Sequence, residues 1–113
     1  MFRDPDSGPP WVPCADVFLS TAGEFTIKVE LAGLCREDLE LSIEGRGVRI
    51  TGHRHDNDQS SGRNRNLVPA INWGWFDLVV DVPADYDLSR ATAKYQNGLL
   101  RVLVPPAEGR SKK

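Results

Sequence analysis

Cysteine is scarce in this chain: Cys14 and Cys35 are the only two among its 113 residues. Two cysteines cannot form a disulfide framework, and these two lack the paired spacing of a metal site. We therefore expect two reduced thiols, as is usual in the cytoplasm. A redox-linked role for Cys35, which lies in the polar stretch GLCRED, is the alternative.

Long apolar runs and an excess of one sign of charge are also missing. No apolar stretch approaches the roughly 20 residues that span a bilayer. The first residues, MFRDPDSGPP, carry acids and prolines where a signal peptide needs an apolar stretch. The 14 basic and 16 acidic residues give a net charge of −2, which provides no general attraction to nucleic acid or to an anionic membrane. We expect a cytoplasmic protein with neither of these as a partner.

The motifs of common enzymes are absent as well. The P-loop, G-x-S-x-G and H-E-x-x-H patterns do not occur, and no nucleophile–base pair stands out. We therefore expect no enzyme, no nucleotide-driven cycle and no cofactor. His53 and His55 are the best metal candidates, because alternate residues of a strand face the same way. A solvated loop edge explains them equally well, and without a predictable third ligand we expect no metal.

What the sequence does have is a series of short segments in which apolar and polar residues alternate. EFTIKVEL is the clearest, with every second residue apolar. The strands expected on this basis are 14–20, 24–31, 39–43, 47–52, 75–83, one near 88–95, and 99–105. Such short strands, separated by Gly, Pro and Asn, predict an all-β fold, an antiparallel β-sandwich. CREDL and ADYDLS each fit a single helical turn, and Asn97-Gly98 predicts a type I′ hairpin turn.

The closing strand is apolar on both faces. Leu100, Val102 and Val104 share one face, whereas Leu99 and Leu103 lie on the other. A sandwich buries only the inner faces of its sheets, so the outer leucines need a loop, a partner chain or a ligand to cover them. Non-directional burial of this kind suits a binder of varied sequences.

One long stretch, HRHDNDQSSGRNRNLVPAIN at 53–72, is polar and mostly without expected structure, so it is either functional or disordered. Arg63 and Arg65 are able to contact phosphates, but acids in the same loop favour a solvated polar loop. Beyond it, Trp73 and Trp75 lie on one side of a strand, opposite Phe76. Two interpretations are open. Exposed tryptophans would form a surface for a sugar or a partner, whereas tryptophans covered by an adjoining loop or strand would serve packing alone.

Taken in order, these pieces resemble the α-crystallin domain of small heat-shock proteins. WVPCADV is similar to the family's opening W-x-P-x-x-D, and VRITGHR to its strand L-x-I-x-G-x-R. FTIKVELAGLCREDLELSI resembles the segment between them, and WGWF fits the family's G-x-F. AKYQNGLLRVLVP matches A-x-x-x-N-G-x-L-x-V-x-V-P, which is a fairly specific motif. The resemblance covers residues 11–105.

The resemblance implies an immunoglobulin-like β-sandwich that binds partly unfolded client proteins without ATP and prevents their aggregation. Outside the α-crystallin-type domain at 11–105, residues 1–10 are polar and rich in Pro and Gly and are expected to form a short flexible arm, and 106–113 a similar flexible tail. In bacterial, archaeal and plant members a long loop carries a short strand that pairs with the neighbouring subunit, so residues 54–72 are expected to form that dimerisation loop. The residues expected at the dimer contact are Arg63, Arg65, Leu67, Trp73 and Trp75.

The resemblance also implies a groove between the strand at 39–43 and the one near 88–93. The residues expected to line this groove are Leu39, Leu41, Leu88 and Thr92. In the family it accepts an I-x-I/V motif from the tail of a neighbouring subunit. That motif is absent here and the arm is short, so we expect a homodimer or small homo-oligomer, with co-assembly with related subunits left open.

Two departures from the family bear on the dimer. Ala70 and Ile71 stand where the family usually carries an E-R-like pair, and Leu78 replaces a later arginine. Those charges commonly serve the dimer contact, so these replacements leave the geometry of the dimer open. The leading hypothesis is a stress-response holdase of the small heat-shock type. The alternative is a dimerising adaptor that binds one specific partner without general chaperone activity, and a carbohydrate-binding sandwich that uses the tryptophans is a weaker third.

Overall fold

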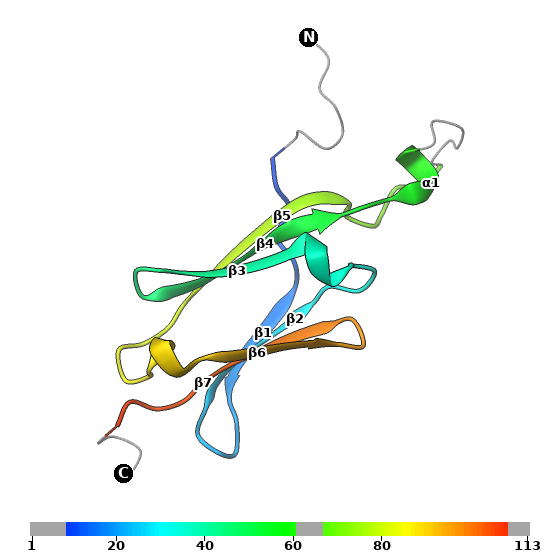
Figure 1. Cartoon of the computed structure of the whole chain (residues 1–113). Helices are drawn as coiled ribbons and strands as arrows, with labels where there is room; N and C mark the ends of the chain where they lie inside the picture. Colours follow the sequence, from blue (N-terminus) through cyan, green and yellow to red (C-terminus); the bar gives the residue numbers. More distant parts are fainter. Residues whose placement is uncertain (1–8, 61–66, 109–113) are drawn as a thin grey trace.

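The computed structural model describes residues 9–60 and 67–108 and shows two antiparallel β-sheets packed face to face (Figure 1). One sheet has four strands in the order β1-β2-β7-β6, and the other has three in the order β3-β4-β5. The strands are β1 (Ala15–Leu19), β2 (Phe25–Glu30), β3 (Leu39–Glu44), β4 (Gly47–Arg54), β5 (Gly74–Asp81), β6 (Thr92–Gln96) and β7 (Leu99–Val104). This architecture confirms the predicted antiparallel β-sandwich.

The core lies between the sheets, and the predicted alternation places its residues. Ile27 and Val29 of β2 are fully buried, and they face Ile50 and Phe76 from the other sheet. The inner face of β7 is buried as predicted, through Leu100, Val102 and Val104. Burying each such side chain is worth about 1.5–3 kcal/mol, so this interior supplies the main drive to fold.

The hairpin turn between β6 and β7 forms where it was predicted. Asn97 and Gly98 have φ angles of 55° and 77°, the left-handed values that a type I′ turn requires. The turn also packs closely, because a Cβ at residue 98 would stand 3.2 Å from the Cα of Ala32. Glycine is therefore needed there for both conformation and space.

Among the described residues, three short helices occupy connections between strands. The two predicted single turns form as η2 (Arg36–Asp38) and η3 (Leu88–Arg90). The strand expected near 88–95 therefore begins only at Thr92, because the Asp87 side chain accepts a hydrogen bond from the Ser89 N–H at 3.1 Å and starts a helical turn instead. Within the part of the chain that the structure describes, no helix is long and apolar enough to cross a membrane.

The predicted dimerisation loop connects β4 to β5. It was expected to be mostly structureless, but it contains α1 (Asn57–Ser60). No strand occurs in its described residues, 55–60 and 67–73. Residues 61–66, and with them Arg63 and Arg65, lie outside the described residues.

The segment before β1 covers the open edge of β5. The Trp11 N–H donates to the carbonyl oxygen of Trp75, and the Trp11 carbonyl oxygen accepts from the N–H of Asp77, both at 3.0 Å. The Trp11 ring packs on the ring of Phe76 with a centroid distance of 5.4 Å. The backbone edge of β5 is therefore paired at this point.

Candidate functional site

A groove opens between β3 of one sheet and β6 of the other. It has a volume of about 200 Å³ and is lined by Leu41, Ser42, Ile43, Val48, Ala91, Thr92, Ala93 and Val102. Val48 and Val102 are buried and form its floor, whereas Ile43 is 51% exposed at its rim. Both walls are edge strands, whose unpaired backbone groups are able to bond an extended segment. The groove can therefore hold apolar side chains of such a segment.

The structure brings together only two of the four residues expected to line this groove. Leu41 and Thr92 line it. Leu39 faces a different hollow, beside η2. Leu88 is buried in the core, because it lies on η3 rather than on a strand. The alanines on either side of Thr92 were missed, although their small side chains create much of the space.

A second apolar surface lies along β1, the outer strand of the four-stranded sheet. Val17 and Leu19 lie on the same face of the sheet as the core residues of β2, because they are paired with Ile27 and Phe25. They are nevertheless 48% and 60% exposed, since three strands cannot cover a face of four. Phe18, on the opposite face of β1, is also exposed.

The backbone of β1 also has one open edge. The Glu30 N–H donates to the Cys14 carbonyl oxygen at 3.0 Å, and the Ser20 N–H donates to the Glu24 carbonyl oxygen at 2.9 Å. Since hydrogen-bonded pairs alternate in an antiparallel ladder, the even-numbered residues of β1 bond to β2. The N–H and C=O groups of the odd-numbered residues, such as Val17, point away from the sheet and can pair with another strand.

Exposed apolar side chains also gather in the described end of the long loop. Leu67 is 76% exposed, and Val68 and Ile71 are among the other exposed large apolar residues. The residues of this loop therefore offer the apolar surface that a second chain would need. Of the expected dimer-contact residues, the structure places Leu67, Trp73 and Trp75 at the surface.

The two tryptophans have different surroundings. Trp75 is on β5 and points outward, opposite Phe76, as predicted. Its ring meets the ring of its cross-strand partner His53, with 4.7 Å between the centroids. Trp73 precedes the strand instead of lying on it, and its ring lies over the guanidinium of Arg54, 5.3 Å away.

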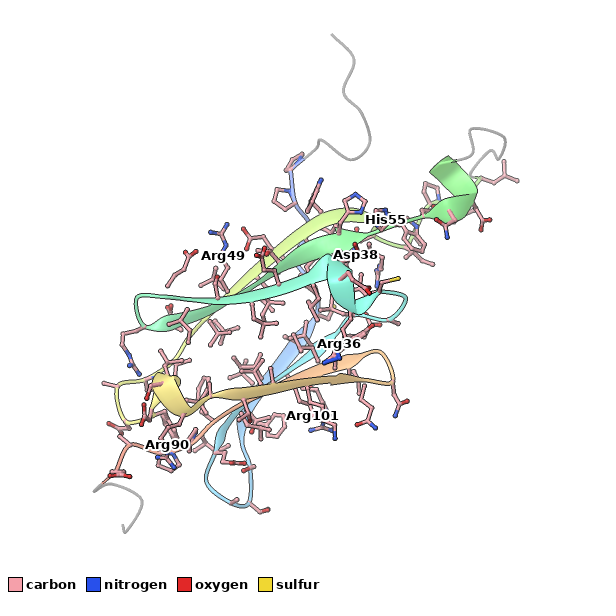
Figure 2. The ribbon with its side chains drawn as sticks, viewed as in Figure 1. Arg36, Asp38, Arg49, His55, Arg90 and Arg101 are labelled. Carbon is pink, nitrogen blue, oxygen red and sulfur yellow. The ribbon has the colours of Figure 1, made fainter. Side chains whose placement is uncertain are left out.

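His53 and His55 do converge, with 4.2 Å between their ring centroids. Figure 2 shows His55 beside Asp38 where η2 approaches the end of β4, and the His55 Nε2 atom is 3.5 Å from the Asp38 Oδ1 atom. A hollow of about 340 Å³ next to them is lined by Glu37, Asp38, Leu39, Glu40, Thr51, Gly52, His53 and Trp75. Across residues 9–60 and 67–108, no group of three or more His, Cys, Asp or Glu is arranged to hold a metal ion.

The outer face of the three-stranded sheet carries an ion-pair network rather than a binding site. Arg49, labelled in Figure 2, donates from Nε and Nη2 to the Asp77 carboxylate at 3.0 and 2.6 Å, and it also pairs with Glu44 at 3.2 Å. The hydrogen bond from Arg49 lowers the pKa of Asp77 below its ordinary value. These contacts join all three strands of the sheet across its outer surface.

The outer leucines of β7 are half-buried. Leu99 lines a hollow of about 190 Å³ with Cys14, Ala15, Asp16, Lys28 and Glu30. Leu103 lies between Thr26 of β2 and Thr92 of β6, its cross-strand partners. Arg101, between the two leucines, is exposed on this face. Neighbouring side chains of the same sheet thus cover part of each leucine.

Comparisons with known proteins find the same family over most of the chain. Residues 18–113 match the Hsp20/alpha crystallin family. The chain is 23% identical over 103 residues to small heat shock protein C2 of Rickettsia felis, a match that covers 90% of this chain and 66% of that protein. It is 29% identical over 86 residues to heat shock protein 16 of Schizosaccharomyces pombe, which covers 74% of this chain and 59% of that protein. The chain thus spans less than two-thirds of the length of these relatives.

Solved structures show the same fold. A small heat-shock protein from Xylella fastidiosa superposes with a TM-score of 0.76 at 23% identity, covering 87% of this chain and 88% of that chain. Heat shock protein 16.0 from Schizosaccharomyces pombe gives a TM-score of 0.73 at 26% identity, covering 86% of this chain and 88% of that chain. These likenesses confirm the immunoglobulin-like sandwich of the α-crystallin domain that the sequence motifs implied.

Proposed function

Because the chain belongs to the Hsp20/alpha crystallin family, we propose that it is an ATP-independent holdase that binds partly unfolded proteins and prevents their aggregation. The open groove between β3 and β6 is the observation that supports this function most. It joins an apolar floor to two strand edges, which suits extended segments with apolar side chains. Burying one such side chain is worth about 1.5–3 kcal/mol, so a few together support micromolar binding after the costs of association.

We further propose that the protein works as a homodimer or small homo-oligomer. In this proposal, the loop of a second copy pairs with the open edge of β1. The exposed apolar residues of the loop, among them Leu67 and Ile71, match the exposed Val17 and Leu19 of β1 in character. An apolar contact also fits the replacement of the family's charged pair by Ala70 and Ile71. In this arrangement the loop adds a strand to the four-stranded sheet.

A cytoplasmic location belongs to the same proposal. Cys14 and Cys35 are both exposed and free. Exposed free thiols are typical of a reducing compartment, whereas secreted domains of this size commonly pair their cysteines.

The alternative is an adaptor that holds one specific partner. It is favoured by the size and polarity of the groove, since about 200 Å³ with Ser42 and Thr92 in its walls fits a short and defined segment. The two functions differ in their range of partners. A saturable complex with one protein supports the adaptor, and capture of unrelated clients supports the holdase.

The test is to heat purified protein with several unrelated, thermally unstable clients and to follow turbidity and native mass by light scattering. The holdase proposal predicts that turbidity falls as the protein approaches stoichiometric amounts, and that client and protein appear together in soluble complexes. Unchanged aggregation of every client at stoichiometric protein would rule out this function.

A further inference from the structure

Arg54 joins the two ends of the long loop. It is the last residue of β4 and only 8% exposed. Its Nε and Nη2 atoms donate to the carbonyl oxygen of Asn72 at 3.0 and 2.8 Å. Since the loop leaves the sandwich after Arg54 and returns at Asn72, one side chain closes its base.

The same side chain anchors this base to the other sheet. Its Nη1 atom donates to the carbonyl oxygen of Ala32, at 3.1 Å, in the turn that follows β2. Gly33 stands next in this turn with a φ of 81°, and a Cβ there would lie 4.0 Å from the Arg54 Cδ atom. The start and end of the loop are therefore fixed relative to both sheets.

Two indole rings surround the buried cation. The Arg54 Cζ atom is 4.5 Å from the centroid of the Trp11 ring and 5.3 Å from that of Trp73. The Trp11 indole N–H in turn donates to the Gly74 carbonyl oxygen at 3.2 Å. Among the described residues, no carboxylate pairs with Arg54, so carbonyl dipoles and aromatic faces compensate its charge.

A buried cation held in this way favours one geometry. Removing a charge from water is costly, and the cost is offset only when the surrounding groups are placed to meet it. The planar fork of a guanidinium can bond two carbonyl oxygens while its faces remain stacked, which a lysine ammonium cannot reproduce. The contacts with Asn72 and Ala32 therefore hold the loop base in one position.

We propose that Arg54 is the positioning residue of the subunit contact: it fixes both ends of the loop so that the loop can reach the β1 edge of a second copy. This inference rests on the proposed dimer. Trp11, in the segment before β1, contacts the same guanidinium, so Arg54 holds both this segment and the loop.

The test compares Arg54→Met and Arg54→Lys with wild-type protein by sedimentation equilibrium. We expect the dimer dissociation constant to rise at least tenfold in Arg54→Met, with a smaller rise in Arg54→Lys, which keeps the charge and remains informative if the methionine variant fails to fold. Trypsin should cleave after Arg63 and Arg65 several-fold faster in both variants. Circular dichroism establishes that the sandwich persists.

Two control variants separate positioning from simple loss of stability or charge. Arg49→Met removes an arginine from the outer face of the same strand, and Ile50→Val lowers core stability without touching the loop base. Neither should change association or cleavage. A wild-type dimer that both Arg54 variants leave intact, with cleavage unchanged, overturns the role of Arg54 alone. A wild-type chain that stays monomeric overturns the subunit contact itself, and holdase activity is decided separately by the aggregation assay.

Discussion

Gly52 and Phe76 are direct cross-strand partners on β4 and β5, and the Phe76 ring occupies the space where residue 52 has no side chain. A Cβ at residue 52 would stand 2.6 Å from the Phe76 Cζ atom and would also overlap the carbonyl oxygen of Asp38. The glycine thus lets the largest fully buried side chain approach β4 closely while the end of η2 lies over the same position. Backbone and ring are too close for any relaxation that leaves both in place.

Replacing Gly52 with alanine should therefore destabilise the fold. We expect the free energy of unfolding to fall by about 1–3 kcal/mol, the usual cost of overpacking a core, as measured by urea denaturation. Gly23→Asn is the control, because a Cβ at residue 23 meets nothing within 4 Å and asparagine tolerates its φ of 82°. Equal midpoints for the two variants would contradict the packing account.

Most of the fold could be predicted from the sequence, because apolar and polar residues alternate along a strand that has one buried face and one face in water. EFTIKVEL has one face that must be buried, and β2 forms over nearly the same residues. The strand predicted near 88–95 was less accurately placed, because Asp87 and Ser89 form a local hydrogen bond that competes with strand structure. Local capping of this kind leaves the apolar pattern unchanged. ADYDLS did predict a helical turn, but periodicity alone does not show that the turn extends to Arg90 and delays the strand to Thr92.

The candidate site was harder to predict than the fold, since it depends on how two distant strands approach each other. Leu88 has the character of a groove residue, but the turn at η3 directs it into the core. Ala93 gives no signal in sequence, because its contribution is the space it leaves empty. Arg54 was part of a recognised motif, yet its partners Trp11 and Asn72 are brought to it only by tertiary structure.

The Arg49–Asp77 ion pair predicts a pH dependence of stability. The hydrogen bond from Arg49 lowers the pKa of Asp77 in the folded protein. The stability this provides is fully present above the unfolded pKa of about 3.9, and it is lost as the pH falls through the lower folded value. The difference in urea midpoint between wild-type protein and Asp77→Asn should therefore shrink when the pH is lowered from about 6 to about 3.

Asp81→Asn is the control for this experiment, because Asp81 lies exposed on the same strand. Its urea midpoint should differ little from that of wild-type protein. A difference for Asp77→Asn that stays constant over this range would show that the ion pair does not contribute through the pKa of Asp77.

The proposed client binding should depend on the rim of the groove. Ile43→Ser removes an apolar side chain that is 51% exposed, so it should weaken suppression of client aggregation several-fold with little loss of stability. Val79→Ser is a matched control, since Val79 is another β-branched residue, is 53% exposed and lies on the outer face of the same sheet. Equal activity of the two variants would move the client site away from the groove.

The β1 edge gives the sharpest test of the subunit contact. The N–H of Val17 points away from β2, so Val17→Pro removes no hydrogen bond of the sandwich but blocks pairing with an incoming strand. We expect this variant to remain folded and to sediment as a monomer at concentrations where the proposed wild-type dimer forms. Asp16→Pro is the converse, because it removes a bond of the β1–β2 ladder and should lower the melting temperature. A Val17→Pro dimer with the wild-type dissociation constant would show that subunits meet elsewhere, since loss of the central donor weakens any strand pairing at this edge.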